Sequence, residues 1–256
     1  MSGWVWAGLL GAVLWTLPVQ AREVWRMSTA ELPPAIGAKL PSQGYYPVLV
    51  RRVLQELDTD LELDFLPPHR AMQEAAEGRH IAVFPMVRTP EREREFLVSE
   101  PIFIVRVRVF VRRDDPWNGG GVEALRGHLL CNILGAKLHP ELQQAVDDGR
   151  LQVQRVGEIG ACFRMLALRR VRFVVTGENT GFEGMQALPD GGRLFRVAGP
   201  VLAEQPVHLL FSRRIRGNAQ RMQAFDQALR RLRSQGVMAK LEQQVLPQAP
   251  KPTATR

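Results

Sequence analysis

The stretch PPHRAMQEAAEGRHIAVFPMVRTPEREREFLVSEPIF, residues 67–103, decides the fold of this chain. Its two leading prolines predict a helix start. Gly78 predicts the end of that helix, because glycine readily takes the left-handed conformation of a helix C-terminus. The apolar segment 81–85 predicts a short buried strand. Thr89 and Pro90 predict a second helix start, since threonine caps helices and proline suits their first position.

This second helix start forms a predicted anion-binding corner. Glu91 complements the positive end of the helix dipole, and free backbone N–H groups at a helix N-terminus bind anions. Arg92 lies in the first turn, where a guanidinium can hold a carboxylate with two parallel hydrogen bonds. Alternatively, Arg92 is only a surface partner of Glu91 or Glu95, and exposed ion pairs contribute little stability.

Predicted strands and helices alternate on both sides of this stretch. The predicted strands cover residues 23–27, 61–66, 81–85, 106–112, 129–134, 151–155, 171–176 and 207–211. The predicted helices cover residues 46–57, 67–77, 140–147, 160–168, 218–233 and 238–244, with a further helix start near Val122. This alternation is typical of an α/β fold, in which apolar strands lie between helices and ligands bind at the carboxyl ends of strands. Two such lobes that face each other would form a cleft.

The composition indicates a globular chain. Its 256 residues are 45% hydrophobic and 23% charged, which is enough for one large domain or two small ones. The net charge of +8 raises the question of a polyanionic partner. We predict no nucleic-acid partner, because the basic residues are scattered among acidic ones and no zinc-finger, helix-turn-helix or RNA-binding signature accompanies them.

Both ends of the chain are predicted to lie outside the fold. Residues 4–17 form an uncharged apolar run, and Val19, Gln20 and Ala21 supply a cleavage site, so residues 1–21 are predicted to be a signal peptide. No Lys or Arg precedes the run. An uncleaved anchor is the alternative, although the run is shorter than the roughly 20 residues that span a bilayer. The polar, proline-rich residues 247–256 are predicted to be a disordered tail.

Cys131 and Cys162 are the two cysteines of the chain. Export to an oxidising compartment would favour a disulfide between them, and two buried free thiols are the alternative. They are too few for a structural zinc site, which needs about four nitrogen or sulfur ligands. The five histidines show no metal-ligand spacing, and the sequence contains no nucleophile elbow, phosphate loop or zinc-protease motif. We therefore expect no metal, no cofactor and no catalytic residue.

Residues 67–103 also carry a family resemblance. The matching elements are a helix with Arg70 that ends in Gly78, a strand with Phe84, the motif R-T-P-E-R at 88–92 and the motif F-x-x-S-E-P at 96–101. On these residues the chain resembles the bacterial extracellular solute-binding proteins of family 3, a group that contains the polar amino-acid receptors of ABC importers. The likeness extends more weakly over nearly all of the mature chain.

The resemblance implies a periplasmic binding protein fold of type II, with two α/β lobes joined by a two-strand hinge. We predict a discontinuous first lobe from residues 22–110 and 206–246, and a second lobe from residues 111–205. The implied function is capture of a small polar ligand, an amino acid or a related organic acid, by hinge closure in the periplasm. The expected protein is a monomer that catalyses no reaction and delivers its ligand to an ABC-type permease.

Two alternatives stand beside the importer function. A stand-alone or sensor-associated receptor would have the same fold, because fold does not determine function. A periplasmic enzyme similar to cyclohexadienyl dehydratase would need a carboxylic acid in the cleft as a general acid, and Glu178 is the candidate for that role.

The resemblance also implies ligand-binding residues. In the family, an Arg at the position of Arg92 takes the ligand carboxylate. Thr89 and Arg88 belong to the same R-T-P-E-R motif, and Arg70 lies in the matching helix that ends in Gly78. Phe84 and Tyr45, or its neighbour Tyr46, would form an apolar shelf for the ligand, since binding pockets commonly have aromatic walls. Packing in the core is the alternative for these aromatic side chains.

The chain departs from the family pattern at several of these positions. Val87 stands where amino-acid receptors usually carry Ser, and Ala136 and Lys137 stand where the second lobe usually offers Ser or Thr. Lys137 would favour an anionic ligand through its charge, or would simply be solvated. The acid that commonly holds the ligand ammonium has no match, and Gly177 or Glu178 lies near its place. Glu178 would then hold the ligand, or would be an ordinary loop carboxylate.

Overall fold

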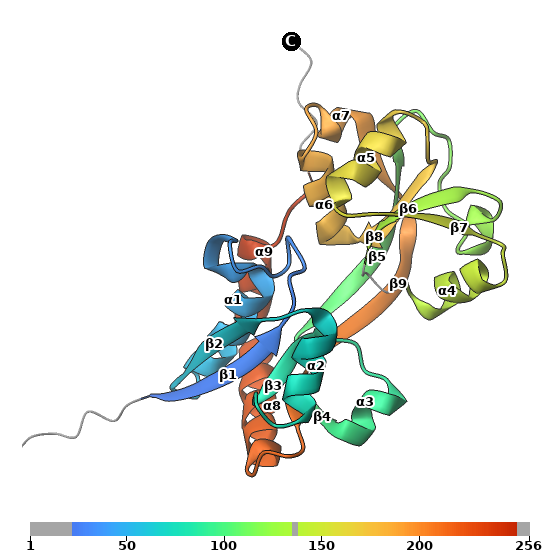
Figure 1. The fold of residues 1–256 in the computed structure, drawn as a ribbon. Coiled ribbons are helices and arrows are strands. Elements are labelled where there is room, and N and C mark those ends of the chain that lie inside the picture. Colours follow the sequence, from blue (N-terminus) through green and yellow to red (C-terminus); the bar gives the residue numbers. More distant parts are fainter. Residues whose placement is uncertain (1–21, 135–137, 250–256) are drawn as a thin grey trace, which may run out of the picture.

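The computed structural model of the protein describes residues 22–134 and 138–249. Figure 1 shows two bodies joined by two long strands, β5 (Phe103–Arg112) and β9 (Phe195–Ser212). The α/β fold with two lobes that the sequence predicts is confirmed. The predicted signal peptide at residues 1–21, Lys137 and residues 250–256 of the predicted tail lie outside the described residues.

The first body combines the amino-terminal strands with the carboxy-terminal helices. Its strands are β1 (Glu23–Thr29), β2 (Thr59–Phe65), β3 (Ala82–Met86) and β4 (Phe96–Val98). β1 pairs in parallel with β2 and β3, whereas β3 and β4 pair antiparallel with the last part of β9. The helical elements are η1 (Pro41–Gln43), α1 (Tyr45–Gln55), α2 (Pro68–Ala76), α3 (Pro90–Glu95), α8 (Asn218–Ser234) and α9 (Val237–Val245).

An apolar stripe determines how α1 packs. Leu49, Val50, Val53 and Leu54 recur at helical spacing and are buried, so one side of the helix faces the sheet. Burying each such side chain contributes about 1.5 to 3 kcal/mol to folding. This core places the amino-terminal end of α1, with its two tyrosines, against the second body.

The second body is a smaller α/β unit. Its strands are β6 (Leu129–Ile133), β7 (Gln152–Val156) and β8 (Phe173–Gly177). Its helical elements are η2 (Glu123–Leu125), α4 (Pro140–Asp147), α5 (Ile159–Ala167), α6 (Glu178–Gln186) and α7 (Gly191–Leu194). β6 pairs in parallel with β7 and β8, and β8 pairs antiparallel with β5. A disulfide between Cys131 and Cys162 ties β6 to α5, as predicted.

β5 and β9 cross from one body to the other as an antiparallel pair. Residues 103–107 of β5 face residues 203–207 of β9, and residues 109–112 face residues 195–198. The register shifts between Val107 and Val109, so the extra residues of β9 form an irregular segment at the level of Arg108. The Arg108 guanidinium donates a 3.2 Å hydrogen bond to the carbonyl of Gly199 in this segment.

Three sequence predictions of secondary structure are wrong. The expected helix near Val122 is only the single turn η2, because three consecutive glycines precede it and helix-forming residues follow for only a few positions. β9 begins at Phe195 rather than at residue 207, because pairing with β5 overrides the Gly and Pro within its sequence. The helix α6, which begins at Glu178, is missing from the predictions because its glycines weaken the helical signal.

Candidate functional site

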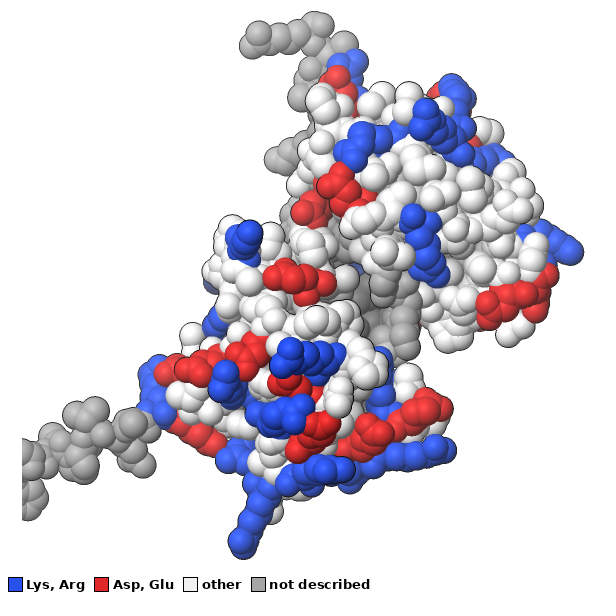
Figure 2. Space-filling model, viewed as in Figure 1, with Lys and Arg blue, Asp and Glu red and all other residues white. Residues whose placement is uncertain are grey.

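A cavity of about 540 Å³ lies between the two bodies. Figure 2 shows the surface hollowed at this level, with both uncharged and charged side chains around the hollow on the face in view. The first body contributes residues that include Ala30, Leu32, Tyr46, Met72, Phe84, Val87 and Arg92. The crossing strands contribute Val105, Val107, Gln205 and Val207. The second body contributes residues that include Asn132, Ile133, Leu134, Leu138, Leu142, Val175, Thr176 and Thr180. The volume suits a small organic ligand.

Arg92 reaches this cavity from the predicted corner. Thr89 has an extended backbone and caps α3, and its Oγ1 accepts a hydrogen bond from the Arg92 backbone N–H at 3.3 Å. The Arg92 Nη1 donates a 2.5 Å hydrogen bond to the Val87 carbonyl, which orients the guanidinium. Burial lowers the pKa of Arg92, and the charge of Glu91 raises that pKa less strongly. The surroundings as a whole therefore disfavour the positive charge, and an anion in the cavity would offset this effect.

Arg88 and Arg70 do not reach the cavity. Arg88 forms an ion pair with Glu93, and its side chain is 63% exposed. Arg70 lies on α2 with its side chain 66% exposed, and its Nε contacts Glu74 Oε1 at 2.7 Å. Although both belong to the stretch that carries the resemblance, the structure places neither of them with Arg92, because each points toward an acidic partner outside the cavity.

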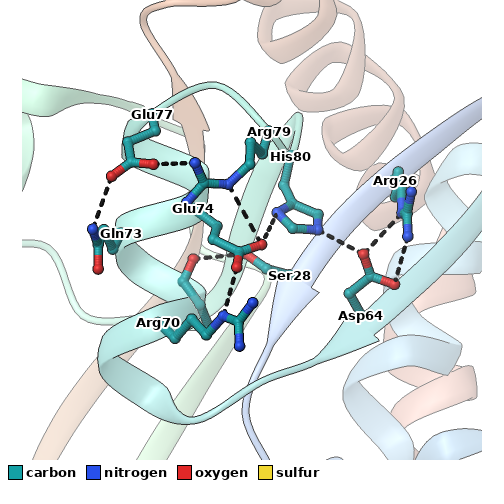
Figure 3. Close-up of polar contacts among 10 residues, drawn as sticks. Arg26, Ser28, Asp64, Arg70, Gln73, Glu74, Glu77, Arg79 and His80 are labelled. Atoms are coloured by element: carbon teal, nitrogen blue, oxygen red, sulfur yellow. Dashed lines mark hydrogen bonds and ion pairs between the residues drawn. The ribbon is translucent and has the colours of Figure 1, made fainter.

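Arg70 belongs instead to a polar network at the edge of the first body (Figure 3). His80, nearly fully buried, contacts Asp64 at 2.7 Å, and Arg26 contacts the same carboxylate at 2.8 Å. The hydrogen bond from His80, followed by that from Arg26, lowers the pKa of Asp64. Glu74 connects Arg70 to this group, so the network ties α2 to the adjacent strands β1 and β2.

The aromatic residues divide between the cavity and a contact between the bodies. Phe84 and Tyr46 line the cavity, so one member of the predicted tyrosine pair is part of its wall. Tyr45 is buried beside Tyr46, with ring centroids 4.7 Å apart, and its hydroxyl hydrogen-bonds with Thr180 of α6. Burial raises the pKa of Tyr45. Tyr45 therefore connects the bodies rather than lining the cavity.

Glu178 lies beside the cavity and is held by two arginines. Its carboxylate contacts Arg106 Nε at 3.3 Å and Arg108 Nε at 3.7 Å, and its side chain is 19% exposed. Its neighbours Gly177 and Thr180 line the cavity, whereas Glu178 does not. The role of Lys137 as a ligand residue falls outside the described residues.

Much of the cavity wall is apolar, and sequence reasoning missed it. Val105 and Val107 come from β5, Val175 from β8 and Leu142 from α4. The sequence does not predict that these residues share one wall, because the pairing of β5 with β8 and the position of α4 are not visible in it. Leu134, at the end of β6, also lines the cavity although its side chain remains 70% exposed.

Two further properties of the described residues bear on function. Within residues 22–134 and 138–249, every helix is too short or too polar to traverse a bilayer. The same residues contain no group of three His, Cys, Asp or Glu side chains arranged to hold a metal ion.

Two α/β bodies, two crossing strands and a cavity between them define a two-lobed solute-binding protein. The model of the bacterial extracellular solute-binding proteins, family 3, matches residues 36–248, and the chain belongs to this family. A comparison of the sequence with curated proteins gave no match.

Solved structures with the same fold have diverse roles. A probable amino-acid ABC transporter extracellular-binding protein from Bacillus subtilis is 16% identical, with a TM-score of 0.71, over 88% of this chain and 98% of that one. A histidine kinase sensor domain is 19% identical, with a TM-score of 0.66, over 90% and 98% of the two chains. An ancestral amino acid-binding protein, a precursor of cyclohexadienyl dehydratase, is 16% identical, with a TM-score of 0.63, over 87% and 94%. At these identities the likeness shows the fold alone.

Proposed function

We propose that the protein is a periplasmic receptor that captures a small carboxylate, an amino acid or a related organic acid, in the cavity between its lobes. The observation that carries this proposal is the position of Arg92. Its partly desolvated guanidinium lines the cavity beside the capped start of α3. A guanidinium in such surroundings gains more from a carboxylate than an exposed one does, because less water screens the interaction.

Closure of the lobes would complete the site. We propose a first lobe of residues 22–110 and 206–246 and a second lobe of residues 111–205, so that the chain crosses between them twice. The irregular segment of β9 opposite Arg108 supports a hinge at this level, because a break in the ladder allows the strands to bend. A ligand that touches both lobes would stabilise the closed form, which a partner could then distinguish from the open form.

The proposed location and partner follow from the family and from the sequence. Residues 1–21 would direct export as a cleaved signal peptide, and the mature protein would act in the periplasm as a monomer. An ABC-type permease is the proposed partner, in keeping with the extracellular-binding protein from Bacillus subtilis. A sensor partner is the second candidate, since the histidine kinase sensor domain shares the fold.

Binding without catalysis fits the site better than a dehydratase activity does. Glu178, the candidate general acid, is paired with Arg106 and Arg108. A general acid must reach the substrate, whereas the Glu178 carboxylate faces these two guanidinium groups and does not line the cavity. A turnover assay with prephenate tests this, because formation of phenylpyruvate would favour the enzyme over the receptor.

A thermal-shift screen tests the proposed function. The mature chain, residues 22–256, would be screened with L-amino acids, polyamines and organic acids, because a ligand of the native state raises the melting temperature by mass action. Arg92→Ala should weaken the binding of the best ligand by roughly tenfold or more, since a charge-assisted hydrogen bond is lost. Arg88→Ala, from the same motif but outside the cavity, is the matched control and should bind normally. Equal affinities of Arg92→Ala and the wild type would refute the proposal.

A further inference from the structure

The chemistry of the cavity wall points to a narrower ligand class than the family implies. We propose that the protein binds monocarboxylates that have an apolar body and no ammonium group, such as aryl-alkanoic or branched aliphatic acids. This inference rests on the proposed function, because it requires Arg92 to hold a carboxylate in the cavity. It concerns the rest of the ligand, namely the α-ammonium that an amino-acid receptor would hold beside the carboxylate, and the body of the ligand.

No suitable carboxylate faces the cavity to balance an ammonium. Among the described residues that line the cavity, Glu31 is the sole acid. Glu31 is exposed, and its Oε1 accepts a 3.1 Å hydrogen bond from the Ala38 backbone N–H. Glu178 is paired with two arginines beside the cavity. Residues 135–137, outside the described residues, are Gly, Ala and Lys and contain no acid.

One of the neutral hydrogen-bond acceptors that line the cavity already has a partner in the protein. The Asn132 Oδ1 already accepts a 2.7 Å hydrogen bond from the Ile133 backbone N–H. An ammonium taken out of water needs a paired charge or several acceptors. Beyond Asn132, the polar side chains in the described lining include Thr176, Thr180, Gln205, His69 and His139, and none of these five is an acid. An α-ammonium would also lie close to the positive charge of Arg92, because it is attached next to the carboxylate.

The remaining wall suits a hydrocarbon group. Val105 and Val107 of β5 and Val175 of the paired strand β8 all line the cavity with aliphatic side chains. Leu142 of α4 and Leu134 after β6 also line it, on the second body. Leu134 is 70% exposed, so lobe closure over an apolar ligand would remove it from water. The positive charge of Arg92 and these aliphatic side chains together match a ligand that has a carboxylate and an apolar body.

Matched ligand pairs test this inference by calorimetry on the mature chain. 3-Phenylpropanoate and L-phenylalanine differ only in the α-ammonium, as do 4-methylpentanoate and L-leucine. In at least one pair, the acid without the ammonium should bind at least tenfold more tightly than the amino acid, and Arg92→Ala should remove this binding. Succinate, which has a second carboxylate in place of an apolar end, should bind more weakly than that acid.

The outcomes separate this inference from the proposed function. If an L-amino acid or succinate binds more tightly and its binding depends on Arg92, the proposed function stands and the narrower ligand class is wrong. If no acid or amino acid shows binding that depends on Arg92, the proposed function fails and the inference fails with it.

A second variant tests the aliphatic wall itself. Val105→Thr keeps the shape of the side chain but adds a hydroxyl group that the bound hydrocarbon would leave without a hydrogen-bond partner. The affinity for the preferred acid should fall about fivefold. Val24→Thr, on an exposed position of β1 outside the cavity, is the control and should leave the affinity unchanged. An unchanged affinity in Val105→Thr would show that the ligand does not touch this wall.

Discussion

The Arg92 guanidinium donates a 2.5 Å hydrogen bond to the backbone carbonyl of Val87, five residues earlier in the chain. The bond joins the carboxyl end of β3 to the first turn of α3. It holds a flexible side chain at the cavity wall before any ligand arrives, so less conformational entropy is lost on binding. Val87 offers no side-chain hydroxyl to a ligand, so Arg92 carries more of the recognition than it would beside a Ser.

Arg70→Ala should leave ligand binding unchanged. Arg70 lies in the ion-pair network at the edge of the first body, and its guanidinium does not line the cavity. The exposed pair with Glu74, four residues later, should contribute only about 0.3 to 0.5 kcal/mol to stability. Calorimetry with the best ligand of the screen checks the affinity. A loss of tenfold or more would place Arg70 in the site after all.

Reduction of the disulfide should destabilise the protein by about 3 to 4 kcal/mol, because the bond between Cys131 and Cys162 closes a loop across 31 positions in the unfolded chain. Urea unfolding with and without reductant measures the difference. Mass spectrometry provides the control, since the oxidised protein should weigh about 2 Da less than the reduced form. Two freely alkylated cysteines in exported material would contradict the bond.

Gly181→Ala should destabilise the protein by about 1 to 3 kcal/mol, although Ala normally favours a helix over Gly. A Cβ at this position of α6 would lie 2.0 Å from Cζ of the buried Phe110 ring. Gly157→Ala is the matched control, because a Cβ there meets nothing within 4 Å, and its effect should be within about 0.5 kcal/mol. Equal melting temperatures of the two variants would show that α6 is not packed against Phe110.

Glu183→Gln should stabilise the protein at neutral pH. Burial raises the pKa of Glu183, and its Oε2 has no hydrogen-bond partner among the described residues. Below the unfolded pKa, the carboxyl is protonated in both states and costs nothing. As pH rises from the unfolded pKa through the raised folded pKa, the unfolded state releases a proton that the native state retains, so the native state loses stability, and the penalty is complete above the folded pKa.

The free energy of unfolding, measured from pH 3.5 to 8, checks this sign. The wild type should lose stability relative to Glu183→Gln as pH rises through this window, and the difference should vanish at the acidic end. A difference that grows as pH falls would mean that the Glu183 carboxylate is stabilised rather than penalised by its surroundings.

The sequence predicts the local features of this site better than its assembly. Thr89 and Pro90 specify the start of α3 through capping and backbone preference, which are local effects. The sequence could not show that Arg92 lines the cavity whereas Arg70 does not, because the orientation of α2 depends on how it packs on β1 and β3. The apolar cavity wall could not be predicted either, since Val107 and Val175 come to the same wall only through the pairing of β5 with β8.

A double-mutant cycle by isothermal titration calorimetry tests the role of Arg92 most directly. The best-binding carboxylate of the screen and its primary amide would be titrated into the wild type and into Arg92→Ala. The wild type should prefer the acid over the amide by roughly 30-fold or more, and Arg92→Ala should show little preference, because the guanidinium recognises the ligand charge. The same preference in both proteins would contradict the account.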